Sequence, residues 1–168
     1  MFQIGDKVVY PVHGAGVIEA IEKRVVLGEE KHYYVLAIPT SSMKVLVPLD
    51  NANAMGIRYV IKEDEVASVI EVLKGPESPM VEKWNYRYRL NMDKLKSGDI
   101  YEVAEVVRNL SLRDIVKTLS SGEKRLLDQA KDILVSELVL VRNENADGVM
   151  EKLELIFKGV EDAPDAQA

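Results

Sequence analysis

The sequence predicts an α+β fold, in which a small β module of SH3-like type precedes an all-helical domain. Residues 1–48 alternate short runs of β-branched and aromatic residues with glycine and proline turns. After Pro79, apolar residues recur at intervals of three and four, the spacing of amphipathic helices. The expected divisions are a β module at 1–60, a helix and proline-containing linker at 61–79, a helical domain at 80–160 and a disordered acidic tail at 161–168.

Prolines and glycine turns separate the expected strands. Proline cannot donate to a strand ladder, so Pro11, Pro39 and Pro48 are expected to end strands. Gly14 and Gly16 are expected to form a tight turn. The expected strands are 7–10, 17–26, 32–38 and 43–47, with a hairpin loop at 27–30. Several short strands in such a length are typical of a strongly bent sheet or barrel, and such modules mostly bind partners.

Capping residues mark where the helices begin. Asp99 follows Ser97 and Gly98 as a helix cap, and Ser120 has Glu123 three residues later, the spacing of a capping box. The expected helices are 63–73, 80–95, 100–110 with a continuation or kink over 111–119, a long helix from the Ser120 cap to Val141, and 149–160.

Composition limits what this protein can bind by itself. The chain of 168 residues has a formal net charge of −6, whereas non-specific affinity for nucleic acid comes mainly from cations that neutralise phosphates. Segment 81–96 departs from this background with five cations against two anions. Any contact with DNA is therefore expected to be local.

The residue inventory also disfavours several kinds of chemistry. The chain has no cysteine and two histidines, which argues against disulfides, thiolate chemistry and a metal site. No stretch has the length of an apolar membrane span, and the N-terminus has no signal-peptide pattern. We expect a cytoplasmic protein with no membrane contact, no cofactor and no small-molecule substrate.

No motif predicts an enzyme. Gly14 and Gly16 precede a strand rather than a helix, so they do not match a dinucleotide loop. Residues 121–125 (SGEKR) lack the spacing of a phosphate loop, although a helix start with two cations could hold one backbone phosphate. A small hydrolase that uses His13 is a remote alternative, because no acid or serine partner lies near it in the sequence.

The stretch 83–89 (KWNYRYR) concentrates the only tryptophan with two tyrosines and three cations. Aromatic rings interleaved with cations suit a nucleic-acid surface. Trp84 also belongs to a helical stripe with Val81, Tyr88, Met92 and Leu95, which favours burial in a core. Both interpretations of Trp84 remain open on the residues alone.

A set of short motifs, in order along the chain, resembles the CarD/CdnL family of bacterial RNA polymerase-binding transcription regulators. Each motif is weak alone, but their order is specific, and the resemblance runs from about residue 2 to residue 160. The motifs are 5–11 (GDKVVYP), 13–14 (HG), 47–48 (VP), 84–89 (WNYRYR), 97–99 (SGD), 104–108 (AEVVR) and 119–125 (LSSGEKR).

The resemblance implies a Tudor-like polymerase-interaction domain that docks on the RNA polymerase β subunit, and a helical domain that lies on promoter DNA. It implies that Trp84 wedges into the minor groove at the upstream edge of the transcription bubble. The implied DNA-backbone contacts are Arg87, Arg89, Lys124 and Arg125, and the implied polymerase contacts are Arg24, Val35, Leu46 and Pro48. Some members have arginine where this chain has Leu46, so the contact there would be apolar.

On this basis the sequence predicts a non-enzymatic transcription regulator that stabilises the open promoter complex and reaches the nucleoid through RNA polymerase. The alternative is a protein–protein adaptor of the transcription machinery without direct DNA contact, in which Trp84 is a core residue.

Overall fold

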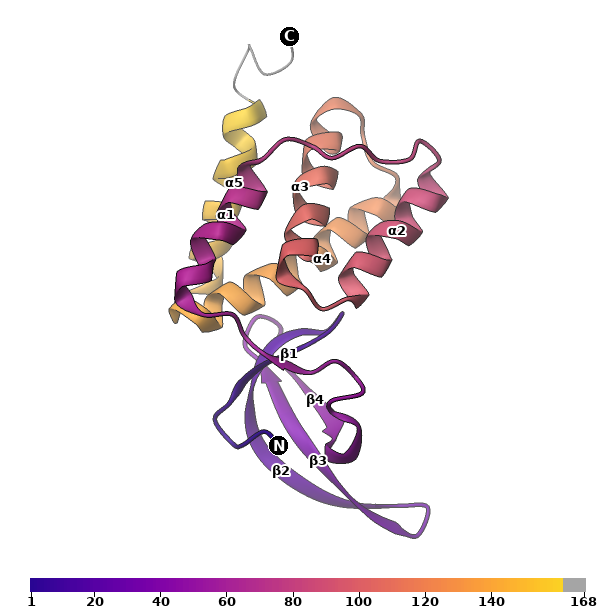
Figure 1. The fold of residues 1–168 in the computed structure, drawn as a ribbon, viewed down its shortest axis with the longest axis vertical. Coiled ribbons are helices and arrows are strands. Elements are labelled where there is room, and N and C mark those ends of the chain that lie inside the picture. The colour runs from indigo at the N-terminus through magenta and orange to yellow at the C-terminus, as the bar shows by residue number, and fades with distance from the viewer. Residues whose placement is uncertain (162–168) are drawn as a thin grey trace.

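The computed structural model describes residues 1–161 and confirms the α+β class, with an antiparallel sheet followed by helices (Figure 1). The strands are β1 Lys7–Tyr10, β2 Gly14–Val26, β3 Glu29–Ile38, β4 Met43–Pro48 and β5 Arg58–Tyr59, in the order β4-β3-β2-β1-β5. The α-helices are α1 Val66–Lys74, α2 Trp84–Lys96, α3 Ile100–Val116, α4 Ser121–Arg142 and α5 Ala146–Glu161, with short 3-10 turns at Leu49–Asn51 and Glu63–Glu65. The predicted tail, beyond Glu161, lies outside the described residues.

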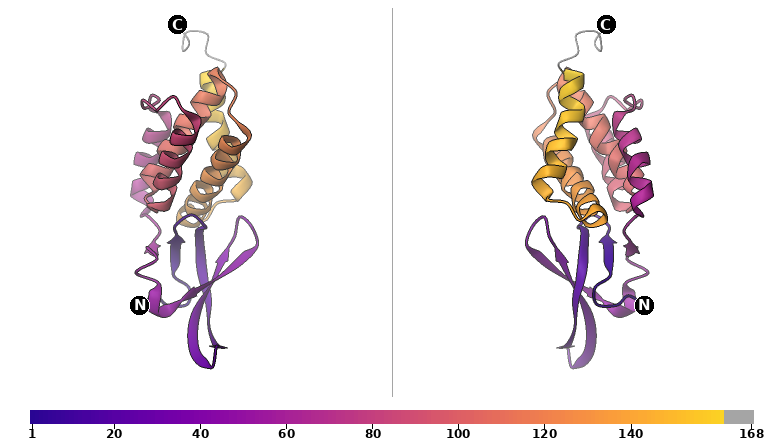
Figure 2. Two further views of the ribbon diagram at one scale, coloured as in Figure 1. Left: turned by 90° about the vertical axis from the view of Figure 1, so that its right-hand side faces the viewer. Right: turned by 90° about the vertical axis from the view of Figure 1, so that its left-hand side faces the viewer.

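One face of the sheet carries the core of the β module. The other face is covered by α4 at the β1–β2 end and is uncovered towards β4, and this uncovered part is called the open face. Alternate residues of each strand point to opposite sides, and Ile18, Tyr34, Leu36 and Val47 all point into the core of the module. The register between β2 and β3 shifts between Ile18 and Ala20, which indicates a β-bulge. The long β2–β3 hairpin extends away from the helices (Figures 1 and 2).

Two details of the β module differ from the sequence prediction. The glycines expected to form a turn lie within β2, where Gly14 pairs with Tyr10 at a positive φ of 112°. A side chain at Gly16 would lie 2.6 Å from the carbonyl oxygen of Ala37, so close strand packing requires glycine there. The hairpin loop is also shorter than expected, because Leu27 and Gly28 both have positive φ and close it alone.

Helix α1 packs within the helical domain, although Pro76 and Pro79 suggest a boundary after it. Val66, Val69 and Leu73 of α1 belong to the same buried core as residues of α3, α4 and α5. The proline-containing connection from α1 to α2 runs along the helical domain (Figure 1). The helix expected within segment 61–79 thus belongs to the helical core, and the proline-containing part of the segment connects it to α2.

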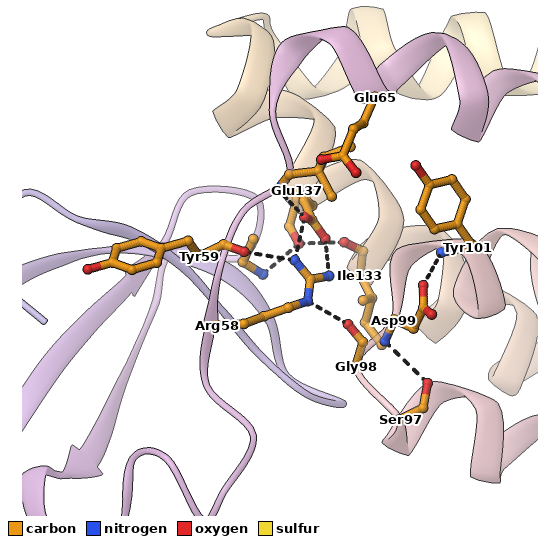
Figure 3. Close-up of polar contacts among 12 residues, drawn as sticks. Arg58, Tyr59, Glu65, Ser97, Gly98, Asp99, Tyr101, Ile133 and Glu137 are labelled. Carbon is orange, nitrogen blue, oxygen red and sulfur yellow. Dashed lines mark hydrogen bonds and ion pairs between the residues drawn. The ribbon is translucent and has the colours of Figure 1, made fainter. Parts of the chain in front are cut away.

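The sheet and the helices contact each other through specific polar groups. The Ala15 N–H donates to Ser136 Oγ at 2.8 Å, and the Lys7 Nζ donates to the Leu140 carbonyl at 2.9 Å. Arg58 of β5 forms an ion pair with Glu137 of α4 (Figure 3). No helix in the described part of the chain has an apolar stretch long enough to cross a membrane.

Candidate nucleic-acid interface

Trp84 is the first residue of α2, and 57% of it is exposed to solvent. Its ring lines an open groove between α2 and the first turns of α4. The other lining residues are Asn85, Tyr88, Arg89, Met92, Asp93, Lys96, Gly122 and Arg125. The interpretation of Trp84 as a core residue is therefore wrong.

The helical stripe ends where the core ends, which explains this exposure. The residues of α2 that are buried are Arg87, Asn91 and Leu95, spaced by four. Tyr88 and Met92 are partly buried against the same core. Trp84 lies one turn beyond this contact, at the end of the helix that points away from the sheet (Figure 1). Helical spacing identifies a face but does not show how far the neighbouring helices extend along it.

The fluorescence of the free protein tests this exposure directly, because Trp84 is the one tryptophan of the chain. We expect a red-shifted emission that both acrylamide and iodide quench, iodide strongly because the groove is cationic. The fully denatured protein provides the reference for complete exposure. A blue-shifted emission protected from both quenchers would contradict an exposed ring.

Arg87 is not part of the exposed cationic surface, contrary to the prediction that it faces the DNA backbone. It is 5% exposed and forms a two-point ion pair with Glu123, with Nε–Oε2 and Nη2–Oε1 distances of 3.1 and 2.5 Å. Its Nη1 also donates to the carbonyls of Val81 and Glu82 at 3.1 and 2.8 Å. The guanidinium is thus engaged inside the protein, and it joins the segment before Trp84 to the start of α4.

This pairing also changes how α4 begins. Ser120 caps the helix by accepting from the Glu123 N–H at 3.3 Å, as the capping-box spacing predicts. The Glu123 carboxylate is bound by Arg87 instead of returning to the Ser120 backbone. One half of the predicted capping box is therefore present.

The other predicted cations lie on the protein surface, and two of them line the groove with Trp84. Arg89, Lys124 and Arg125 are exposed, and Arg89 and Arg125 line the groove together with Lys96. One anion, Asp93, is among the lining residues. The positive end of the α4 dipole adds to this potential. The groove thus combines an accessible ring with local positive charge, which suits a nucleic-acid backbone beside a stacked or inserted aromatic group.

Tyr86 is a second exposed ring that the predicted site did not include. It does not line the groove, and Lys83 and Arg89 lie over its ring at 5.8 and 6.0 Å from the centroid. The alternation of aromatic and cationic residues in 83–89 was the signal that could have identified it.

The predicted polymerase contacts share the open face of the sheet. Val35 pairs with Leu46, and residues at even spacing from this pair point to the same side. The pairing of Tyr33 with Pro48 and of Ala20 with Val35 extends this face along β4 and β2. Arg24, Val35, Leu46 and Pro48 therefore all point away from the module's core. Of these four residues Val35 is buried, so Arg24, Leu46 and Pro48 are the ones that a partner could contact.

A sheet with one open face, joined to helices that present an exposed tryptophan in a basic groove, defines a two-module protein with two separate candidate binding surfaces. Residues 2–61 match the CarD-like/TRCF RID domain, and residues 68–154 match the C-terminal domain of CarD. The chain is also 41% identical over 152 residues to the Bacillus subtilis (strain 168) protein named "Putative transcription factor YdeB", with 90% of this chain and 96% of that protein covered. The chain therefore belongs to the CarD family of transcription regulators. The C-terminal match begins within α1, consistent with the packing of this helix in the helical core.

Proposed function

We propose that this protein binds the RNA polymerase β subunit through the open face of its sheet and stabilises the open promoter complex with Trp84. The exposure of Trp84 at a groove lined by Arg89, Lys96 and Arg125 is the observation that carries this proposal. The membership of the N-terminal module in the CarD-like/TRCF RID group supports docking on polymerase. In this proposal Trp84 enters the minor groove at the upstream edge of the bubble.

The energetics of the two surfaces are complementary. A side chain that binds the distorted junction better than closed duplex stabilises the open state by its difference in affinity. The net charge of −6 makes the free protein a weak DNA ligand, because its overall negative charge repels phosphates. Docking on polymerase raises the effective concentration of the groove at the junction.

Footprinting of promoter DNA bound by polymerase, with and without the protein, tests the proposal. We expect added protection and altered base reactivity at the upstream edge of the bubble. An unchanged footprint, with polymerase binding intact, would favour an adaptor that does not contact DNA.

The salt dependence of the ternary complex provides a test of the cationic surface. Replacing Arg89 and Lys124 together with alanine should flatten the slope of log affinity against log salt by about one to two, because each phosphate contact contributes about 0.9 to the slope. Lys74→Ala with Lys158→Ala is the matched control, because both lysines are exposed and neither is a predicted DNA contact or lies on the open face of the sheet. An unchanged slope in the Arg89 and Lys124 variant would show that these side chains do not neutralise phosphates.

A further inference from the structure

Helix α4 carries both acidic side chains that are buried among the described residues, Glu123 at its first turn and Glu137 near its end. They are 14 positions apart, which corresponds to about 21 Å along a helix and to nearly the same side of it. Each binds the guanidinium of an arginine from a different part of the chain. Arg87 comes from α2 beside Trp84, and Arg58 comes from β5 of the sheet.

The contact at Glu137 joins three segments (Figure 3). The Nη1 and Nη2 atoms of Arg58 each donate to one carboxylate oxygen of Glu137 at 2.8 Å. The Arg58 Nε donates to the Gly98 carbonyl at 2.9 Å, in the turn between α2 and α3. The Glu137 carboxylate also accepts the N–H of Ile61 at 2.9 Å. Glu137 is 2% exposed, so this set of bonds lies within the contact between sheet and helices.

Close backbone packing surrounds this ion pair. A Cβ atom at Gly98 would lie 2.9 Å from Pro11 Cγ, and one at Gly14 would lie 3.0 Å from Ser136 Oγ. Both glycines also have positive φ. The two modules therefore meet in one specific arrangement rather than through a smooth apolar surface.

We propose that α4 is a rigid strut between the two modules, in which Arg58–Glu137 fixes it to the sheet and Arg87–Glu123 fixes α2 to it. The strut holds the Trp84 groove in one position relative to the open face of the sheet. This inference rests on the proposed function, because it concerns the geometry between the polymerase-facing and DNA-facing surfaces.

Directional bonding is the physical reason to assign this role to the ion pairs. A planar guanidinium bound at two points by a carboxylate restricts both distance and orientation, whereas apolar contact is non-directional. A buried ion pair is often no more stabilising than apolar residues of similar volume. Two such pairs on one helix, each joining a different element, favour a positioning role. Arg58, Arg87, Glu123 and Glu137 are positioning residues in this scheme.

The test compares the double variant Arg58→Met with Glu137→Met against the parent protein. Methionine pairs roughly preserve volume and leave no buried charge, so the modules should stay folded while the directional contact is lost, at the cost of the bonds to the Ile61 N–H and the Gly98 carbonyl. Because the chain has no cysteine, spin labels at Ala54→Cys, in the exposed loop between β4 and β5, and at Lys117→Cys after α3 report the distance between the modules. We expect a broader distance distribution, unchanged affinity for the polymerase β subunit, and an open-complex lifetime about fivefold shorter.

Two further variants complete the design. Arg58→Lys keeps the charge but loses the planar two-point contact. It should broaden the distance distribution and shorten the open-complex lifetime, each by less than the double methionine variant does. Lys152→Met with Glu144→Met removes an exposed ion pair within the helical domain and should change neither readout.

The outcomes separate the strut from the proposed function. A lifetime that falls without a broader distance distribution, or a broader distribution with an unchanged lifetime, overturns the strut. If Trp84→Ala shortens the lifetime and the Arg58 variants leave both readouts unchanged, the strut is wrong and the proposed function stands. If Trp84→Ala has no effect on the lifetime, the proposed function itself is wrong.

Discussion

Replacing Trp84 with alanine is expected to shorten the lifetime of the open promoter complex while leaving the affinity for polymerase unchanged. The tryptophan is exposed in the free protein, so its removal leaves no cavity in the core. Its contribution is made at the DNA junction, where a central aromatic contact is typically worth about 2 kcal/mol or more. This corresponds to about a thirtyfold change in the rate of bubble collapse. The lifetime is measured by challenge of preformed complexes with a competitor.

Tyr86→Ala is the matched control for this prediction. Tyr86 is exposed to a similar degree on the same helix, but it does not line the groove. We expect its removal to change the lifetime much less than the removal of Trp84. Trp84→Phe, which retains a smaller ring, should lie between the parent and the alanine variant. Equal effects of Trp84→Ala and Tyr86→Ala would argue against a specific wedge and for a diffuse aromatic surface.

Most strands and helices could be predicted because the turn, cap and spacing signals that define them involve residues close together in the sequence. The strand runs 7–10 and 43–47 and the caps at Asp99 and Ser120 depend on residues close in sequence, and all are present in the structure. The packing role of Gly14 could not be predicted in this way. The side chain that leaves little room for a Cβ atom there belongs to Ser136, more than a hundred residues later. A glycine that permits close packing and a glycine that forms a turn look alike in the sequence.

The wrong placement of Arg87 and the open question of the exposure of Trp84 have the same origin. The exposure of Trp84 depends on where the neighbouring helices end, and the burial of Arg87 depends on Glu123, 36 positions away. Sequence spacing placed both residues correctly on α2 but carried no information about these distant partners. A count of cations therefore overestimated the surface available to DNA by one arginine. The roles of Arg89, Lys124, Arg125 and the four sheet residues remain predictions.

Replacing Arg87 with alanine is expected to destabilise the fold by about 3–5 kcal/mol, because it leaves the Glu123 carboxylate buried without its partner. The carbonyls of Val81 and Glu82 would also lose their donors. Chemical denaturation of the purified protein measures the change in the free energy of unfolding. Arg89→Ala is the control from the same helix, and since Arg89 is exposed we expect no measurable loss of stability.

The double variant Arg87→Met with Glu123→Met separates charge burial from geometry. Removing both partners leaves no unpaired charge, so most of the stability lost in Arg87→Ala should return, except the part due to the carbonyls of Val81 and Glu82, which still lack donors. The two-point contact that joins the segment before Trp84 to α4 is still absent in this variant. We therefore expect the open-complex lifetime to stay shortened although the fold is stable. A lifetime restored together with stability would mean that the pair acts only on folding, because apolar packing would then position Trp84 equally well.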